Sequence, residues 1–408
     1  MFKNFFVYLS VYKYNINLKL IFQIFKICLI LIIFYIYDLL ILKNNSMNKL
    51  NNIKYEINNL EYYKNICEKG ILLKSEIFKK VENPKISIIS AIYNRDKFIL
   101  RFLRSIQNQF FNDIEIILID DYSTDNSVEV IKELQKYDKR IILIINNVNK
   151  GTLVSRNEAV LKSRGEYLIF PDPDDILSID SLKFCYTKAK EEQYDIIRFN
   201  LFTGEKKHII KVINKIKINQ IFQPQLLFYN FYSKGYLEQT DFIISNKFIK
   251  RDLYIKSINS IKNYYLIQNM IIYEDGLINF MLYKFANSLY YSKKLLYYYI
   301  QNNQSITINL KNDMEKTIKN CYLYLKFIFE YTKNNKFEKK IAFCVFKNVN
   351  LVISNIKNYE LISKDFFFYY NIINSYLKSK FIHFSYRNQI NKILKHIKKK
   401  ELLVNNNF

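Results

Sequence analysis

The hydrophobic pattern between Lys85 and Asn200 alternates regularly between strand-like and helix-like segments. Short apolar runs predict buried strands, and apolar residues that recur at helical spacing, as at Phe98, Phe102 and Ile106, predict helices between them. The predicted strands are 86–92, 114–119, 141–145, 167–170 and 195–199, and the predicted helices are 98–109, 128–137, 152–163 and 179–192. Successive units of this length predict an α/β fold with a mostly parallel sheet and helices on its faces.

Two local signals mark helix ends in this region. Asn126, with Glu129 three residues later, is predicted to cap the helix that starts at Val128. Gly165 is predicted to end the helix that starts at Thr152. The fourth strand then follows directly after Gly165.

The fourth predicted strand ends in an acidic turn, residues 171–175, which reads Pro-Asp-Pro-Asp-Asp. The two prolines fix φ and so partly pre-set the turn. Asp172 and Asp174 present two carboxylates that can reach one hard divalent cation, directly or through its waters. We therefore predict that Asp172 and Asp174 bind Mg²⁺ or Mn²⁺, which would bridge a phosphate-bearing substrate.

Polar residues also follow the other predicted strands. A nucleoside needs a flat face to stack on and an acceptor for a ring N–H, which Tyr93 (followed by Asn94) and Asp121 could supply. Asn149 and Arg156 bracket the start of a helix, a suitable neighbour for phosphate. Taken singly, a strand-end Tyr commonly packs and an Asp pair commonly forms a turn. In order, along the edge where open α/β sheets bind ligands, they indicate a binding site.

These segments resemble the nucleotide-binding half of glycosyltransferase family 2, which has the GT-A fold. The matching segments, in family order, are SIISAIYNR (87–95), SIQNQ (105–109), DIEIILIDDYSTDNS (113–127), NKGTLVSRN (149–157) and GEYLIFPDPDD (165–175). The resemblance implies that Tyr93 and Asp121 hold uracil or another base and that Asp172 and Asp174 are the Asp-x-Asp pair on the metal and diphosphate. The expected nucleotide-sugar-binding residues are Tyr93, Asn94, Asp121, Asn149, Arg156 and Asp172.

Glu274 and Asp275 precede an apolar run that ends at Phe285. Two acids that open a helix commonly reflect only favourable dipole placement. Beside the first half, however, they resemble the Glu-Asp segment of many family members, in which the Asp is the general base. We therefore expect Asp275, ahead of Glu274, to activate the acceptor. Residues 245–251 and 303–307 also look like family landmarks, so the resemblance covers 85–307.

The resemblance implies metal-dependent transfer with inversion from a nucleotide-diphosphate sugar, here a UDP-sugar, to a hydroxyl of a glycan, lipid or protein-linked acceptor. The Gln-x-x-Arg-Trp motif of processive polymer synthases is absent, which favours transfer of one or a few sugars. Pro173 stands where small residues are common in the family, and Tyr122 stands where Gly is frequent. This altered loop leaves the donor sugar open.

Three other interpretations compete with a transferase. Phosphatases of the haloacid dehalogenase type share an Asp-x-Asp after a strand, but they require Thr or Val where Asp175 and Ile176 stand. Sugar nucleotidyltransferases need an N-terminal Gly-rich loop with Arg, and the first strand here leads into Tyr-Asn-Arg. The third alternative is a catalytically silent, membrane-tethered binding protein on the same scaffold. Retention of the acidic turn together with Asp275 argues against it.

The N-terminal segment differs in character from the rest of the chain. Residues 18–42 are almost entirely apolar, long enough for a single-pass membrane anchor, although Lys26 and Asp38 leave a buried or surface helix as alternatives. We therefore expect a membrane-associated protein. The predicted organisation is a hydrophobic segment (1–43), a stem or linker (44–84), a transferase domain (85–307, divided into 85–200 for the nucleotide and 201–307 for the acceptor) and a helical basic region (308–408).

Composition changes this picture little. The net charge of +25 accompanies few Gly (6), Pro (4) and Trp (0), a pattern that an AT-rich coding sequence imposes. The charge therefore does not by itself predict a nucleic-acid partner, and zinc-knuckle and RRM signatures are absent. Three histidines outside the motifs argue against a His base, and five widely spaced cysteines argue against a disulfide framework.

Overall fold

The computed structural model describes residues 56, 58–73, 77–202, 243–261, 270, 274–300, 320, 323, 324 and 327. The chain divides into two compact units, Met1–Asn59 and Leu60–Phe408, and the elements below belong to the second. The predicted membrane anchor and most of the region 308–408 lie outside the described residues. Within the described residues, no helix is both long and apolar enough to cross a membrane.

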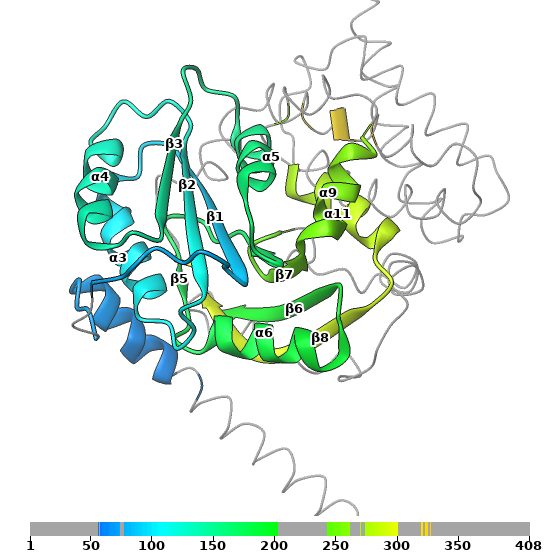
Figure 1. Cartoon of the computed structure of the whole chain (residues 1–408), viewed down its shortest axis with the longest axis horizontal. Coiled ribbons are helices and arrows are strands. Elements are labelled where there is room, and N and C mark those ends of the chain that lie inside the picture. Colours follow the sequence, from blue (N-terminus) through cyan, green and yellow to red (C-terminus); the bar gives the residue numbers. More distant parts are fainter. Residues whose placement is uncertain are drawn as a thin grey trace, which may run out of the picture. The chain divides into compact units, whose positions relative to one another are not determined.

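Strands and helices alternate along the first half as the hydrophobic pattern predicts (Figure 1). This half contains β1 (Ile86–Ile92), α3 (Asp96–Gln107), β2 (Ile114–Asp120), α4 (Ser127–Tyr137), β3 (Ile141–Ile145), α5 (Thr152–Lys162) and β4 (Tyr167–Ile169). The following elements are β5 (Ile176–Leu177), α6 (Ser181–Glu192), β6 (Ile196–Phe202), β7 (Lys247–Lys250), α9 (Arg251–Asn259), α11 (Glu274–Phe285) and β8 (Leu289–Tyr298). All nine predicted elements are confirmed, with ends that differ by at most three residues.

The described strands form one mixed sheet in the order β3-β2-β1-β4-β7-β6-β8-β5. The neighbours among β3, β2, β1 and β4 pair in parallel, as predicted. β7 then runs antiparallel between β4 and β6, and β5 runs antiparallel to β8 at the far edge. β6 and β8 pair in parallel. The sheet is therefore mostly parallel, with two short antiparallel strands that the sequence did not predict.

The two faces of the sheet have separate cores. On β1, Ile88 packs with Phe102 of α3, whereas its neighbour Ile89 belongs to the core that contains Val160 of α5. This alternation follows from the two-residue period of a strand. Figure 1 shows the result, with α3 and α4 on one side of β1, β2 and β3 and α5 on the other. The helices therefore leave the carboxyl ends of the parallel strands to the loops that carry the predicted site.

The start of α4 is confirmed, but its predicted cap is wrong. Asn126 occupies the position before the helix, and its side chain makes no capping hydrogen bond. The Asp125 carboxylate instead accepts hydrogen bonds from the backbone N–H groups of Asp96 and Ser127, each at 3.0 Å. This one side chain therefore serves the starts of two helices, α3 and α4.

The predicted role of Gly165 as a helix end is also wrong. α5 ends at Lys162, and Ser163 after it is already extended. Gly165 lies against β1, where an added Cβ would approach the backbone nitrogen of Ser87 and come within 2.6 Å of its hydroxyl oxygen. Its N–H donates to that same hydroxyl at 2.9 Å. Gly165 is therefore needed for the close approach of the chain to β1 before β4 begins.

Part of the stretch predicted as a linker (44–84) packs against the sheet domain. Residues 60–68 are helical, with Leu60 and Cys67 buried, and the Tyr63 hydroxyl donates to the Ser105 carbonyl at 3.1 Å. Further on, Phe78 forms an isolated parallel bridge with Asp138. These contacts attach the described part of the stretch to α3 and to the chain before β3.

Candidate active site

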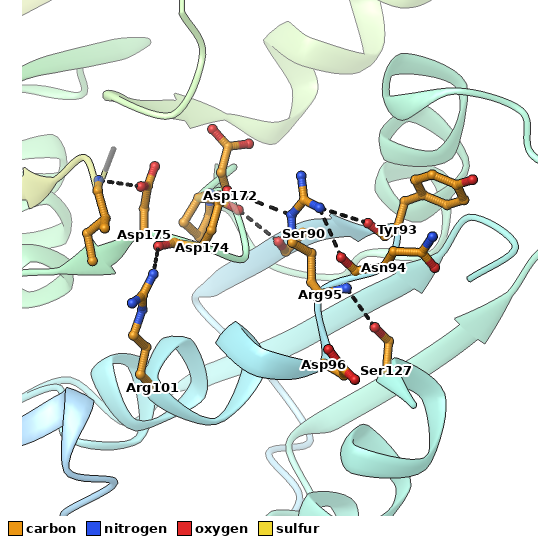
Figure 2. A network of polar contacts seen from close by, with 12 residues as sticks. Ser90, Tyr93, Asn94, Arg95, Asp96, Arg101, Ser127, Asp172, Asp174 and Asp175 are labelled. Atoms are coloured by element: carbon orange, nitrogen blue, oxygen red, sulfur yellow. Dashed lines mark hydrogen bonds and ion pairs between the residues drawn. The ribbon is translucent and has the colours of Figure 1, made fainter. Parts of the chain in front are cut away.

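The acidic turn after β4 is held by hydrogen bonds to its backbone. The Ser90 hydroxyl on β1 donates to the Pro171 carbonyl at 2.8 Å, and the Arg101 guanidinium on α3 donates to the Asp174 carbonyl at 2.5 Å. Within the turn, the Asp175 N–H donates to the Asp172 carbonyl at 3.1 Å. Figure 2 shows the turn between Arg101 and Arg95. The carboxylates of the turn are therefore presented from an ordered backbone.

The third carboxylate of the turn, Asp175, is an anchor. The Tyr297 hydroxyl on β8 donates to Asp175 Oδ2 at 2.7 Å and accepts the Asp172 N–H at 3.0 Å. The Ile300 N–H donates to Asp175 Oδ1 at 2.8 Å. Burial, reinforced by the charges of Asp172 and Asp174, raises the pKa of Asp175 well above its ordinary value. Asp175 therefore fixes the turn from inside and leaves the other two carboxylates for ligands.

Asp172 and Asp174, the predicted metal pair, are the more accessible acids of the turn. Their side chains are 35% and 16% exposed. Burial, opposed by the Arg156 cation and reinforced by neighbouring carboxylates, raises the pKa of Asp172 to about 7. On the other side, Arg95 Nε lies 3.7 Å from Asp174 Oδ2. Each carboxylate of the pair thus has an arginine beside it.

The pair suits a cation that is shared with a phosphate ligand. Among the residues that the structure describes, no three His, Cys, Asp or Glu side chains gather into a metal site. A Mg²⁺-type ion does not need such a cage, because one or two carboxylates, waters and substrate phosphates complete its octahedral shell. Asp172 and Asp174 therefore fit a divalent cation that a diphosphate helps to hold.

A single guanidinium brings the acidic turn and the predicted base together. Arg156 on α5 donates from Nη2 to Asp172 Oδ1 at 2.6 Å and from Nη1 to Asp275 Oδ1 at 2.8 Å. The other oxygen of Asp275 accepts the Ile244 N–H at 3.0 Å. Asp275 opens α11, as the pattern of acids followed by an apolar run indicated. Residues that the sequence separates widely thus share one site.

The neighbouring acid, Glu274, is less suited to be the base. Burial, reinforced by the charge of Asp275, raises the pKa of Glu274 to about 8. A carboxyl group that keeps its proton at neutral pH cannot accept another. Asp275 is therefore the better candidate, as the sequence indicated.

The turns after β1 and β2 are joined to each other. Tyr93 directly follows β1 and is 42% exposed, and Asn94 comes next with φ of 52°. The Asn94 N–H donates to the Ser123 hydroxyl at 3.0 Å, and its side-chain oxygen accepts the Thr124 N–H at 2.8 Å. The exposed ring of Tyr93 is thus carried on a fixed turn, as stacking on a base requires.

Asp121, the predicted acceptor for the base, is buried and already engaged. Its carboxylate accepts four hydrogen bonds of 2.8 to 2.9 Å from the loop before α5 and from α5 itself. A nucleobase N–H would therefore have to share one of these oxygens. Asn149 lies exposed in the same loop. The donors to Asp121 are Asn146 Nδ2, the Lys150 and Gly151 N–H groups and the Ser155 hydroxyl.

Sequence reasoning missed two residues that shape the site. Tyr297 stands in a run of three tyrosines, and only its pairing on β8 reveals which of the three faces the acidic turn. Arg95 follows the Tyr-Asn pair, and its guanidinium donates to the carbonyls of Tyr93 and Asn94 at 3.1 and 2.9 Å. A cation that follows a stacking residue was the available signal for Arg95 (Figure 2).

Comparison with known proteins finds relatives of this chain. Residues 87–258 match the model of glycosyl transferase family 2. An uncharacterized glycosyltransferase of Haemophilus influenzae is 40% identical over 100 residues, which are 24% of this chain and 40% of that protein. The GalNAc(5)-diNAcBac-PP-undecaprenol beta-1,3-glucosyltransferase of Campylobacter jejuni is 26% identical over 279 residues, 66% of this chain and 90% of that protein.

A solved structure shares the fold. The crystal structure of residues 1–349 of S. aureus TarS aligns with a TM-score of 0.51 and 18% identity, covering 72% of this chain and 80% of that one. The mixed α/β sheet described above is consistent with the GT-A fold. Residues 87–258 therefore form a domain of the glycosyl transferase family 2 type, and the relatives that match the chain are glycosyltransferases.

Proposed function

We propose that this protein transfers a sugar from a nucleotide-diphosphate sugar, a UDP-sugar, to a hydroxyl group of a glycan, lipid or protein-linked acceptor. The observation that carries the proposal is that Arg156 donates hydrogen bonds to both Asp172 and Asp275. It supports one site with a phosphate-binding side and a proton-accepting side. The match of residues 87–258 to glycosyl transferase family 2 supports the same reaction class.

On the donor side, the chain offers a stacking surface and polar contacts. The exposed ring of Tyr93 would cover the base, and Asp121 would share an oxygen with a ring N–H. Asn94 and Asn149 belong to the same edge of the sheet. A Mn²⁺ or Mg²⁺ ion on Asp172 and Asp174 would supply Lewis-acid stabilisation of the departing diphosphate.

On the acceptor side, Asp275 is the proposed general base. Its carboxylate takes the proton from the acceptor hydroxyl, the oxygen bonds to the anomeric carbon, and the bond from that carbon to the diphosphate oxygen breaks. A single displacement of this kind inverts the anomeric carbon. General-base catalysis contributes about 10²–10⁴-fold. Glu274 is the second choice, since its raised pKa keeps it protonated.

The acceptor class is proposed from the relatives. The name of the C. jejuni relative includes an undecaprenol-linked glycan, which favours a lipid-linked glycan acceptor here. A membrane anchor within residues 18–42 would hold the enzyme near such an acceptor. Transfer of one or a few sugars fits the absence of the processive motif.

A sugar-nucleotide screen tests the proposal. The full chain is incubated with a panel of UDP-, GDP- and TDP-sugars with Mn²⁺, and free nucleoside diphosphate is measured. We expect release from one UDP-sugar, suppressed by EDTA and by Asp174→Asn. Asp113→Asn, which changes an exposed acid outside the site, should keep the wild-type rate.

The same screen separates the enzyme from the silent binding protein. A silent binder would give saturable UDP binding in calorimetry without release from any donor. Release that EDTA leaves unchanged would contradict the metal assignment while preserving the transferase.

A further inference from the structure

The contacts of Arg156 indicate a role other than binding the nucleotide. We propose that Arg156 is a positioning residue that fixes the base Asp275 relative to Asp172 of the acidic turn. Its two terminal nitrogens are each committed to a different carboxylate, at 2.6 and 2.8 Å. A guanidinium is planar and presents its donors in a fixed fork, so two carboxylates bound to it are also placed relative to each other.

The bridging side chain is nearly enclosed. Arg156 is 5% exposed, while the carboxylates of Asp172 and Asp275 are 35% and 22% exposed. Of its three guanidinium nitrogens, Nη1 and Nη2 make these bonds, and Nε has no hydrogen-bond partner among the described residues. The guanidinium therefore lies beneath the two carboxylates, which keep the surface that faces ligands. A nucleotide would meet Asp172 and Asp275 more readily than the nitrogens already bonded to them.

The helix that carries Arg156 is tied on both sides of it. The Ser155 hydroxyl donates to Asp121 Oδ1 at 2.9 Å, which links α5 to the end of β2. The Tyr254 hydroxyl on α9 donates to Asn157 Oδ1 at 2.9 Å. Three consecutive residues of α5 thus contact three different parts of the molecule. Ser155 bonds to Asp121, Arg156 bonds to the acidic turn and the proposed base, and Asn157 bonds to α9. This arrangement makes Arg156 a fixed reference for both carboxylates.

The bridge predicts a reversal of sign in stability. While Arg156 is present, removing the charge of Asp275 leaves a buried cation with one partner fewer. When Arg156 is absent, Asp172 and Asp275 are uncompensated like charges, and neutralising Asp275 relieves their repulsion. The same substitution should therefore destabilise one background and stabilise the other.

Thermal unfolding of the full-length chain without nucleotide or metal measures this reversal. We expect Asp275→Asn to lower Tm by about 2–4 °C in the wild type and to raise it in Arg156→Met. Arg251→Met is the control background, because Arg251 is a partly buried arginine that bonds to Ser163 and to neither carboxylate of the bridge. In this background Asp275→Asn should lower Tm as much as in the wild type. A drop of equal size in all three backgrounds would overturn the bridge.

A milder variant covers the case in which Arg156→Met does not fold. Arg156→Lys keeps the charge but lacks the fork, so the drop caused by Asp275→Asn should shrink in that background. An undiminished drop would again overturn the bridge.

Kinetics test the consequence for catalysis, which rests on the proposed function. With the donor found in the screen, Arg156→Lys should lower kcat about 100-fold, because a misplacement near 1 Å costs that much. The affinity for UDP with Mn²⁺, measured by calorimetry, should fall only about 10-fold, because Arg156 also orients the proposed metal ligand Asp172. An affinity that falls as far as kcat would make Arg156 a nucleotide ligand and overturn the positioning role.

The two failures are distinguishable. If wild-type protein releases UDP from no donor, the proposed function fails, and the reversal in Tm still decides whether Arg156 bridges the two carboxylates.

Discussion

The two parts of the sheet are built in different ways although both supply the site. β3, β2, β1 and β4 pair in parallel, and β1 with β2 keeps one register from Ile86↔Ile114 to Ile92↔Asp120. The part made of β7, β6, β8 and β5 mixes directions, and β6 with β8 shifts register between Arg198 and Leu201. The first part is regular and local in sequence, and the second is irregular and assembled from distant segments.

The proposed donor-binding residues and the proposed base belong to different parts of the molecule. The proposed donor residues stand on turns that the first part fixes through its own hydrogen bonds. The proposed base lies on α11, outside the parallel strands, and side chains join α11 and β8 to the first part. Arg156 reaches Asp275, and Tyr297 reaches Asp172 and Asp175. Nucleotide binding and sugar transfer should therefore be separable by substitution.

Asp275→Asn is expected to separate nucleotide binding from sugar transfer most strongly. Loss of the base should lower turnover by about 10²–10⁴-fold, because an amide cannot accept the acceptor's proton. The affinity for UDP with Mn²⁺ should change little, since the donor turns belong to the first part. Steady-state kinetics and calorimetry measure the two effects. Asp252→Asn, at an exposed acid on α9, serves as the control, and wild-type turnover in Asp275→Asn would remove Asp275 from the role.

Gly165→Ala should break the first part itself. The new methyl group would overlap the backbone of Ser87, so we expect a loss of about 1–3 kcal/mol in the free energy of unfolding. Gly151→Ala provides the comparison: its added methyl group meets open space, so its loss comes from the backbone alone, whose φ of 85° and ψ of 155° cost about 1–3 kcal/mol in a non-glycine residue. Denaturant unfolding compares the two. Equal m-values and a Gly165→Ala loss below about 1 kcal/mol would contradict the steric argument.

Tyr297→Phe should weaken the link between β8 and the acidic turn. The Asp172 N–H and the Asp175 carboxylate would lose a shared partner, at a cost of about 1–2 kcal/mol. The affinity for UDP with Mn²⁺ should fall about 10-fold, as for groups that orient metal ligands. Tyr298→Phe, next on the same strand, is the control. A fall in stability without any change in affinity would make the link purely structural.

The same contrast explains what the sequence could predict. Buried parallel strands are continuous apolar runs, so β1 to β4 and the helices between them were found. β7 has four residues and β5 two, too few to show a period, and β8 carries Lys293 and Lys294 in its middle. For the site, residue type indicated Asp172, Asp174 and Asp275. Their partners could not be predicted, because Arg156–Asp275 and Asp172–Tyr297 join positions 119 and 125 residues apart.

The smallest effect is expected where the first part departs from regular geometry. Tyr122 has φ of 71° and is 53% exposed, so it bears the cost of a left-handed backbone and gains little packing. A bulky residue with this φ costs about 1–2 kcal/mol, and glycine would remove that strain. Glycine also makes the unfolded chain more flexible, which offsets about half of the gain. Tyr122→Gly should therefore stabilise the protein by about 0.5–1 kcal/mol in denaturant unfolding.

Tyr137→Gly provides the contrast for Tyr122→Gly. Tyr137 is also an exposed tyrosine, at the end of α4, where the backbone is helical, so glycine should destabilise the protein there. If Tyr122→Gly destabilises as Tyr137→Gly does, the ring of Tyr122 makes contacts that outweigh its strain. The turns at the strand ends would then contribute more to the stability of the parallel part of the sheet than their hydrogen bonds alone indicate.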